Sequence, residues 1–304
     1  MSIEDSGLIE DVFVPPLQLH DWQLGSELNR ETFSNNPGVY YFFDKDNLPL
    51  YIGKSIHIRQ RLLSHLNRGR SEERVERMVQ QTSRLGWRET QGDMHAQLLE
   101  NRQIKELTPV FNRAQRRLKR FYSWRLADGR VKLELEQFTH ESFAQRSQVI
   151  YYGIYKTMRA AKAAMMTLAE RERLCLQVLG LERGRAACFR SQIGKCAGAC
   201  DGRESVGDMM SRLLGALLPL CLDLWPYAEP VQLQEGELWH VLYQWQSFGA
   251  SPIKLSQSQL KRWLGRAPVR FDKDEYLIIR RFLKRDGDSA ALVGSDLVER
   301  ELTE

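Results

Sequence analysis

The spacing of hydrophobic residues changes from strand-like to helix-like soon after residue 37. The stretch VYYFFD, residues 39–44, is aromatic and β-branched, and LPLYIG, residues 48–53, has the same character after the polar turn KDN. Pro49 indicates an edge strand or the start of a strand, because proline has no N–H to donate to a sheet. We therefore predict a β-hairpin.

Helical spacing follows the hairpin at once. Apolar residues recur every three or four positions from Ile58 to Leu66, and Ser55 is the predicted cap of this helix. The remaining elements of the module are predicted as a helix over 71–85 opened by Ser71, a strand over 87–90, and a helix over 93–107 that ends before Pro109. The pattern predicts an α+β domain over residues 33–113, with a short antiparallel sheet covered by helices.

A second region, residues 120–304, is predicted to be mixed α/β and to follow the basic connector AQRRLKR. Its pattern predicts a hairpin turning at Asp128-Gly129, a strand over 149–155, a helix over 156–174, a cysteine-containing loop over 175–200, and strands over 238–245 and 275–283. The apolar run Leu213–Trp225 is shorter than the roughly 20 residues that a membrane helix needs. Pro219 interrupts this run, so we expect a buried helix there.

Length and composition agree with two folded domains. The chain has 304 residues, of which 42% are hydrophobic and 27% are charged. Its first dozen residues are acidic and lack the basic and apolar segments of an export signal, so we expect a cytoplasmic protein.

Positive charge is concentrated in one part of the chain. Residues 54–120 contain 16 Lys and Arg against 7 Asp and Glu, whereas the whole chain has a net charge of only +5. A basic module is what binding to a phosphate backbone requires, although a solvated basic helix surface is the plain alternative.

The first domain contains groups suited to phosphodiester hydrolysis. Tyr40 and Tyr51 lie on neighbouring predicted strands, Lys54 follows the second strand, and Arg61 and Glu100 lie on predicted helices. A carboxylate can hold a divalent cation, cations can stabilise the charge of the transition state, and a tyrosine can relay a proton from water. Each residue also has a structural interpretation, since strand aromatics ordinarily pack in a core and a helical glutamate is ordinarily a surface charge.

The order of these residues resembles a known nuclease family. Residues GVY and YIG lie ten residues apart and are followed by GKS, by RQRL at 59–62, by LLEN ending at Asn101, and by PVFN ending at Asn112. This order is similar to the GIY-YIG endonuclease domain, specifically the version in UvrC.

The resemblance implies roles for these residues. Glu100 stands where the family binds a divalent cation, Mg²⁺ or Mn²⁺, while Tyr40 and Tyr51 are the candidates for proton transfer and water positioning. The other implied site residues are the phosphate-stabilising Lys54 and Arg61, and Asn112, which closes the domain. Apart from the resemblance, we predict that the basic residues Arg59, Arg116, Arg117, Lys119 and Arg120 bind DNA. His65 is a departure, because UvrC-type sequences commonly have a tyrosine there; it could share the proton-transfer role or face solvent.

Four of the five cysteines form one group. Cys175, Cys188, Cys196 and Cys200 follow one another with 12, 7 and 3 residues between them. Four thiolates suit tetrahedral zinc or an iron–sulfur cluster, and the spacing alone does not separate the two. The segment is similar to the cysteine-rich region of UvrC, which implies a four-iron four-sulfur cluster, with zinc second and disulfides a distant third. Cys221 lies in the apolar run, where we expect it to be buried.

The resemblance implies an endonuclease of nucleotide excision repair that cuts one strand on the 3′ side of a lesion, in damaged double-stranded DNA pre-bound by a UvrB–DNA complex. We see neither the second nuclease domain nor the helix-hairpin-helix module of UvrC, so we expect a single incision. The alternatives are an inactive DNA-binding or scaffold module and a stand-alone nuclease with its own sequence specificity.

Overall fold

The structure is a computed structural model that describes residues 15–22, 29–68, 73–112, 120–127, 132–139, 142–143, 149–184, 187–265 and 267–286. Its internal contacts divide the chain into two compact units. The first consists of Met1–Arg117 together with Tyr227–Glu304, and the second is Leu118–Pro226. The predicted region 120–304 therefore contributes to both units, because its last part packs on the N-terminal module.

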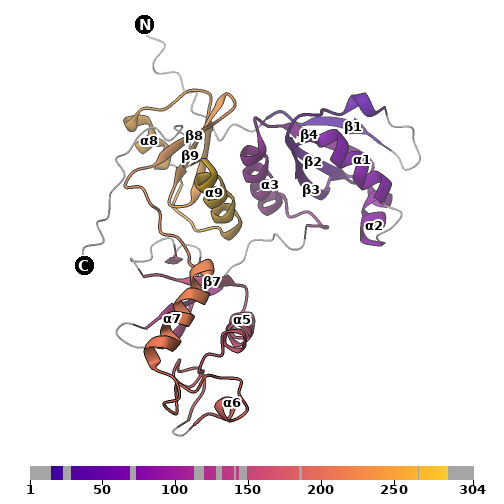
Figure 1. The fold of residues 1–304 in the computed structure, drawn as a ribbon. Coiled ribbons are helices and arrows are strands. Elements are labelled where there is room, and N and C mark those ends of the chain that lie inside the picture. The colour runs from indigo at the N-terminus through magenta and orange to yellow at the C-terminus, as the bar shows by residue number, and fades with distance from the viewer. Residues whose placement is uncertain are drawn as a thin grey trace. The chain divides into compact units, whose positions relative to one another are not determined.

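The N-terminal module is a four-stranded antiparallel sheet with helices on both faces (Figure 1). Its elements are β1 Gln18–Asp21, η1 Arg30–Thr32, β2 Gly38–Phe43, β3 Pro49–Ser55, α1 Ile58–Arg68, α2 Glu73–Gln81, β4 Arg84–Glu89 and α3 Asp93–Leu107. The strand order is β1-β4-β2-β3, so the predicted hairpin forms and Pro49 opens an edge strand. Strand β1, which the sequence pattern did not reveal, pairs with β4.

Strand β2 is buried along its whole length because both of its faces are covered. Tyr40 and Phe42 pack in one core with residues of α1 and α2. Val39, Tyr41 and Phe43 pack in a second core with Leu99 and Ile104 of α3. The alternation of side chains along a strand explains the split, since successive residues point to opposite faces.

The start of α1 differs from the prediction. The helix begins at Ile58, and Ser55 is the last residue of β3 rather than a cap. The Ser55 hydroxyl accepts a hydrogen bond from the His57 N–H instead. The first amides of α1 donate to backbone carbonyls of Ser34 and Asn36, which satisfies groups that a helix start otherwise leaves unpaired.

Residues 231–286 form the C-terminal subdomain of the first unit. It contains β8 Val231–Glu235, β9 Leu238–Tyr243, β10 Gln246–Ser251, α8 Gln257–Leu264 and α9 Lys273–Asp286. The predicted strand over 238–245 corresponds to β9, but the predicted strand over 275–283 is wrong, because this segment is part of α9. The buried residues of this segment recur at helical spacing, and this spacing outweighs their β-branched and aromatic character. They are Tyr276, Ile279, Phe282 and Leu283.

The second unit combines a small antiparallel sheet with helices and the cysteine loop. Its elements are β5 Phe121–Leu126, β6 Leu133–Phe138, β7 Tyr152–Tyr155, α5 Met158–Arg171, α6 Phe189–Gln192, α7 Val206–Leu217 and η3 Leu218–Leu220. The pairing of β5 with β6 confirms the two strands of the second predicted hairpin, while its predicted turn at Asp128-Gly129 lies outside the described residues. Helix α7 ends before Pro219, so Cys221 lies outside it. The backbone of Cys221 forms an isolated antiparallel β-bridge with Tyr152, and the residue is only partly buried, contrary to the prediction.

Among the described residues, no helix combines the length and apolar character that crossing a bilayer would require.

Candidate active site and cysteine cluster

Two tyrosines and a histidine meet on the face of the sheet that α1 covers. The Tyr40 hydroxyl lies 2.9 Å from Nε2 of His65. The Tyr51 ring is 5.4 Å from the His65 ring and 6.1 Å from the Tyr40 ring, measured between centroids. His65 therefore belongs to this group, and the alternative that it faces solvent as a spacer does not agree with the structure.

Burial makes both phenols harder to deprotonate than an ordinary tyrosine, which is already protonated near neutral pH. Burial raises the pKa of Tyr40 well above its usual range, and the neighbouring Tyr51 raises it further, while Arg61 opposes the shift. Burial likewise raises the pKa of Tyr51, with a contribution from the negative charge of Glu100. Either tyrosine can therefore act on a proton only as part of a relay.

The glycines of the two tyrosine motifs leave room for close approaches. A Cβ on Gly53 would lie 2.4 Å from the Tyr40 hydroxyl oxygen and 2.9 Å from Cε1 of Tyr51. A Cβ on Gly38 would lie 2.1 Å from the carbonyl oxygen of Arg88 on the neighbouring strand. Both positions thus need glycine for space and not for backbone conformation, since neither has a positive φ.

Glu100 is held against the edge strand β3. Its Oε1 accepts a hydrogen bond of 3.1 Å from the backbone N–H of Lys54. Burial, with a smaller contribution from the charge of Asp93, raises the pKa of this carboxyl to about 7, although the Lys54 N–H opposes the rise. A carboxylate with a raised pKa and a partly open position can gain from a nearby cation, which would stabilise its charged form.

Lys54 forms an ion pair that the sequence analysis did not identify. Its Nζ lies 2.7 Å from Oδ1 of Asp93, and both side chains are about one third exposed. Burial alone would raise the pKa of Asp93, but the hydrogen bond and charge of Lys54 lower it below its ordinary value. Asp93 precedes Glu100 by seven residues, or two helical turns, and this i, i+7 spacing is the signal that could have placed both on one face.

The two arginines at the start of α1 differ in their surroundings. Arg61 is exposed, and its pKa is raised first by the Tyr40 hydroxyl and also by the charges of Tyr51 and Glu100. Arg59 donates from Nε to the carbonyl oxygen of Phe33 at 2.8 Å, which fixes part of its guanidinium within the protein. Arg61 therefore has its guanidinium available beside the tyrosines.

Asn112 contacts backbone rather than the tyrosines or Glu100. Its Oδ1 accepts from the Ile52 N–H at 2.9 Å, and its Nδ2 donates to the Ile52 carbonyl at 2.7 Å. The side chain thus pairs with edge strand β3 next to Tyr51 and Gly53. Of the predicted DNA-binding residues in the connector, Arg120 is exposed, while Arg116, Arg117 and Lys119 lie outside the described residues.

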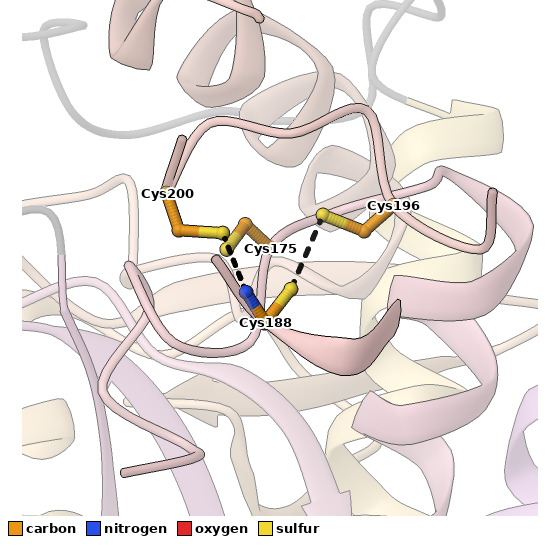
Figure 2. Close-up of side chains that lie close together, drawn as sticks. All are labelled: Cys175, Cys188, Cys196 and Cys200. Carbon is orange, nitrogen blue, oxygen red and sulfur yellow. Dashed lines mark hydrogen bonds between the residues drawn. The ribbon is translucent and has the colours of Figure 1, made fainter. Parts of the chain in front are cut away.

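The four grouped cysteines converge in the second unit, as Figure 2 shows. Their Sγ atoms all lie within 4.8 Å of one another, and three of the four residues are buried. The Sγ atoms of Cys188 and Cys196 are 3.8 Å apart, and the Cys188 N–H lies 3.3 Å from Sγ of Cys200. The backbone of Gly198, at φ +92°, makes the turn between the last two cysteines.

The environment of these thiols is that of a ligand set. Burial raises the pKa of Cys175 and raises that of Cys188 to about 12. Burial also opposes ionisation of Cys200, but the N–H of Cys188 and the neighbouring thiols lower its pKa. Four mutually close thiols, three of them on buried residues, are costly to ionise together without a cation, and none of the five cysteines forms a disulfide. The residues therefore fit a metal site.

Two family models match the chain. The model described as the UvrC-like GIY-YIG domain matches residues 36–113, and the model described as the UvrC/Cho excinuclease middle domain matches residues 129–218. The first contains the tyrosines, Lys54, Arg61 and Glu100, and the second contains the four grouped cysteines.

Curated relatives extend the similarity over most of the chain. Excinuclease cho of Escherichia coli O6:H1 is 39% identical over 251 residues, which cover 80% of this chain and 81% of that protein. The protein of the same name from Salmonella typhi is 38% identical with the same coverage. UvrABC system protein C of a Ruegeria species is 29% identical over 59% of this chain and 28% of its own length.

A solved structure matches the N-terminal part. The GIY-YIG N-terminal endonuclease domain of UvrC from Thermotoga maritima, bound to magnesium as its catalytic divalent cation, is 34% identical. The match covers 26% of this chain and 85% of that domain, with a TM-score of 0.24.

Proposed function

The chain belongs to the Cho/UvrC family of GIY-YIG excinucleases, DNA endonucleases of nucleotide excision repair, and we propose that it cuts one DNA strand on the 3′ side of a lesion. The observation that carries this proposal is the position of Glu100. Its carboxylate is held at the edge of β3 by the Lys54 N–H and interacts electrostatically with Tyr51 and Arg61. This arrangement supports a divalent-cation site at Glu100, with Arg61 and Tyr51 beside the phosphate that is cut.

Glu100 would hold the divalent cation, Mg²⁺ or Mn²⁺, which when bound supplies Lewis-acid stabilisation of the negative charge on the phosphate. Arg61 stabilises the same charge from the other side of β3, and its exposure lets a phosphate reach the guanidinium. Lys54 contributes a second cation, with Asp93 fixing its position.

The proton pathway runs through Tyr40 and His65. With Nε2 of His65 unprotonated, the Tyr40 hydroxyl donates to it across 2.9 Å. As His65 takes that proton, the Tyr40 oxygen can accept one from the attacking water, so the raised pKa of Tyr40 is no obstacle. Tyr51 orients the water. Asn112 keeps edge strand β3, and hence Tyr51 and Lys54, in place through its pair of hydrogen bonds to Ile52.

The cysteine cluster would hold an iron–sulfur cluster, as the resemblance to UvrC implies, with zinc as the alternative. The short Sγ separations favour the alternative, because thiolates around a single zinc ion with bonds of about 2.3 Å lie roughly 3.8 Å apart. The resemblance predicts iron and acid-labile sulfide in anaerobically purified protein, whereas the Sγ separations predict stoichiometric zinc, so metal analysis decides between the two. Stoichiometric zinc without iron would overturn the cluster proposal. Four closely spaced thiols also agree with function in the reducing cytoplasm.

Lesion recognition would reside in a partner. The candidate site presents cations for the phosphate backbone, and phosphate contacts position a protein on DNA without reading its sequence. The resemblance to UvrC supplies that partner, and we propose that the substrate is damaged duplex already bound by a UvrB–DNA complex. Arg59, Arg120 and the rest of the basic connector would hold the DNA backbone.

The deciding experiment is an incision assay on end-labelled duplex with and without one lesion, in the presence and absence of the damage-recognition proteins. We expect one cut, 3′ to the lesion, only when divalent cation and the partner complex are present. Glu100→Gln should abolish the cut and leave DNA binding intact; retained cutting would remove Glu100 from the metal site. Lesion-independent cutting at a fixed sequence would instead indicate a stand-alone nuclease.

A further inference from the structure

Helix α3 carries both Asp93 and Glu100, yet its own sequence provides no side-chain cap. The N-cap residue is Gly92, which has no side chain that could accept a hydrogen bond from the first amides of the helix. The first amides of a helix have no partner within the helix, and a carboxylate at this end is favoured by the helix dipole. A cap for α3 must therefore come from elsewhere.

That cap comes from Glu235, about 140 residues further along the chain. Glu235 ends β8 at the hairpin of the C-terminal subdomain. Its Oε1 accepts from the Met94 N–H at 2.9 Å, and its Oε2 accepts from the His95 N–H at 2.8 Å. The side chain of Glu235 is 18% exposed, so these hydrogen bonds are largely protected from water.

Gly92 is the residue that lets the carboxylate reach the helix. A Cβ at this position would lie 2.3 Å from Oε1 of Glu235 and 2.4 Å from its Cδ. The φ of Gly92 is −178°, which any residue can adopt, so glycine is required here for space alone. The close approach of Glu235 explains this glycine, because the three atoms that a Cβ would meet first all belong to Glu235.

The other end of α3 is fixed by the same subdomain. Nζ of Lys105 lies 2.6 Å and 2.5 Å from the two carboxylate oxygens of Asp272, and 3.2 Å from Oδ2 of Asp274. The side chains of Lys105 and Asp272 are 9% and 12% exposed, respectively. Charges that are this buried interact more strongly than a surface pair.

Helix α9 contacts α3 along its length, and Figure 1 shows α3 between α9 and the sheet. Arg281 of α9 lies 3.9 Å from the Asp93 carboxylate and is hydrogen-bonded to Gln97. On its opposite side, α3 packs on the sheet through Leu99 and Ile104. The helix that bears the proposed metal ligand is thus held between two layers, one of which is the C-terminal subdomain.

We propose that the C-terminal subdomain, residues 231–286, is a brace for α3 and that Glu235 is a positioning residue for the nuclease site. This inference rests on the proposed function of Glu100. By capping Met94 and His95, Glu235 fixes the first turn of α3 and with it Asp93, the partner of Lys54. Glu100 lies six residues beyond Met94, about 9 Å along the same helix at 1.5 Å per residue, so movement of the first turn displaces its carboxylate relative to β3.

The test compares Glu235→Ala with Glu237→Ala in the full-length protein. Glu237 is an exposed acid on the same hairpin and serves as the matched control. We expect Glu235→Ala to speed amide hydrogen exchange at Met94 and His95 by about five-fold or more, as expected for a lost cap. It should weaken Mn²⁺ binding several-fold and lower kcat on lesion-bearing DNA about ten-fold without changing KM, because small misplacements at a reacting centre are costly.

Two further variants protect the test against general misfolding. Glu235→Gln keeps the shape and one acceptor, so it should give an intermediate effect, and Gly92→Ala should reproduce Glu235→Ala by displacing the carboxylate. Faster exchange with unchanged Mn²⁺ affinity and unchanged kcat would overturn the positioning role, as would equal effects of the Glu235 and Glu237 variants. If wild-type protein makes no cut, the proposed function fails, whereas the exchange and Mn²⁺ measurements still support or overturn the brace.

Discussion

Gly53→Ala adds a single methyl group at the centre of the proposed site. The new Cβ would lie 2.4 Å from the Tyr40 hydroxyl oxygen, whereas real Cβ contacts essentially never fall below 3.0 Å. Tyr40 is 1% exposed and cannot swing into solvent, so the hydroxyl or β3 must move by about 0.6–1 Å. This displacement is large compared with the 2.9 Å contact between Tyr40 and His65.

The expected loss of rate is on the order of 10²-fold in kcat, the effect typical of a 1 Å misplacement at a reacting centre. Overpacking should also lower the free energy of unfolding by about 1–3 kcal/mol. Both follow from sterics alone, because Gly53 does not have a positive φ and alanine can adopt its backbone conformation.

Gly215→Ala is the matched control. Gly215 lies in α7, and a Cβ there meets nothing within 4 Å. The same substitution should therefore stabilise the protein by about 0.5–1 kcal/mol through helix propensity and leave cleavage unchanged. Single-turnover cleavage and urea unfolding measure both effects. A Gly53→Ala variant that cuts at the wild-type rate would refute the requirement for a fixed Tyr40 hydroxyl.

Three further predictions concern charge and proton transfer. Arg61→Ala should lower the cleavage rate by about 10²-fold with little change in DNA affinity, and an effect on affinity alone would make Arg61 a docking residue. If Tyr40 and His65 form one relay, the cleavage defects of Tyr40→Phe and His65→Phe should not add in the double variant; additive defects would separate their roles. Glu275 is partly buried, and its removal from water, followed by the charge of Asp272, raises its pKa from 4.5 to about 7. The folded protein therefore holds this proton more tightly than the unfolded chain. Ionisation of Glu275 lowers the free energy of unfolding, and this loss is absent below pH 4.5, grows as the pH rises, and is complete above about pH 7. That cost is on the order of 3 kcal/mol. Glu275→Gln should remove it, so the variant should lose less stability than wild type between about pH 5 and about pH 8 in urea unfolding; identical pH dependence would contradict the burial argument.

Much of the N-terminal module could be predicted from local pattern. Aromatic and β-branched runs, Pro49 at a strand start and the turn KDN specify the β2–β3 hairpin, because these signals act over a few residues. The segment over 275–283 shows the limit of such signals. Its isoleucines and aromatics favour a strand, but the period of its buried residues is helical, and packing determines the outcome.

The sequence by itself also determined which chemical groups are present: two tyrosine–glycine motifs, two cations, one helical glutamate and four spaced thiols. Only the tertiary structure decided which of them meet. It brought His65 to Tyr40, Asp93 to Lys54 and Glu235 to the start of α3, over separations of 25, 39 and about 140 residues. Contacts of this range leave no periodic trace in the chain, because they depend on how whole elements pack rather than on the residues beside them.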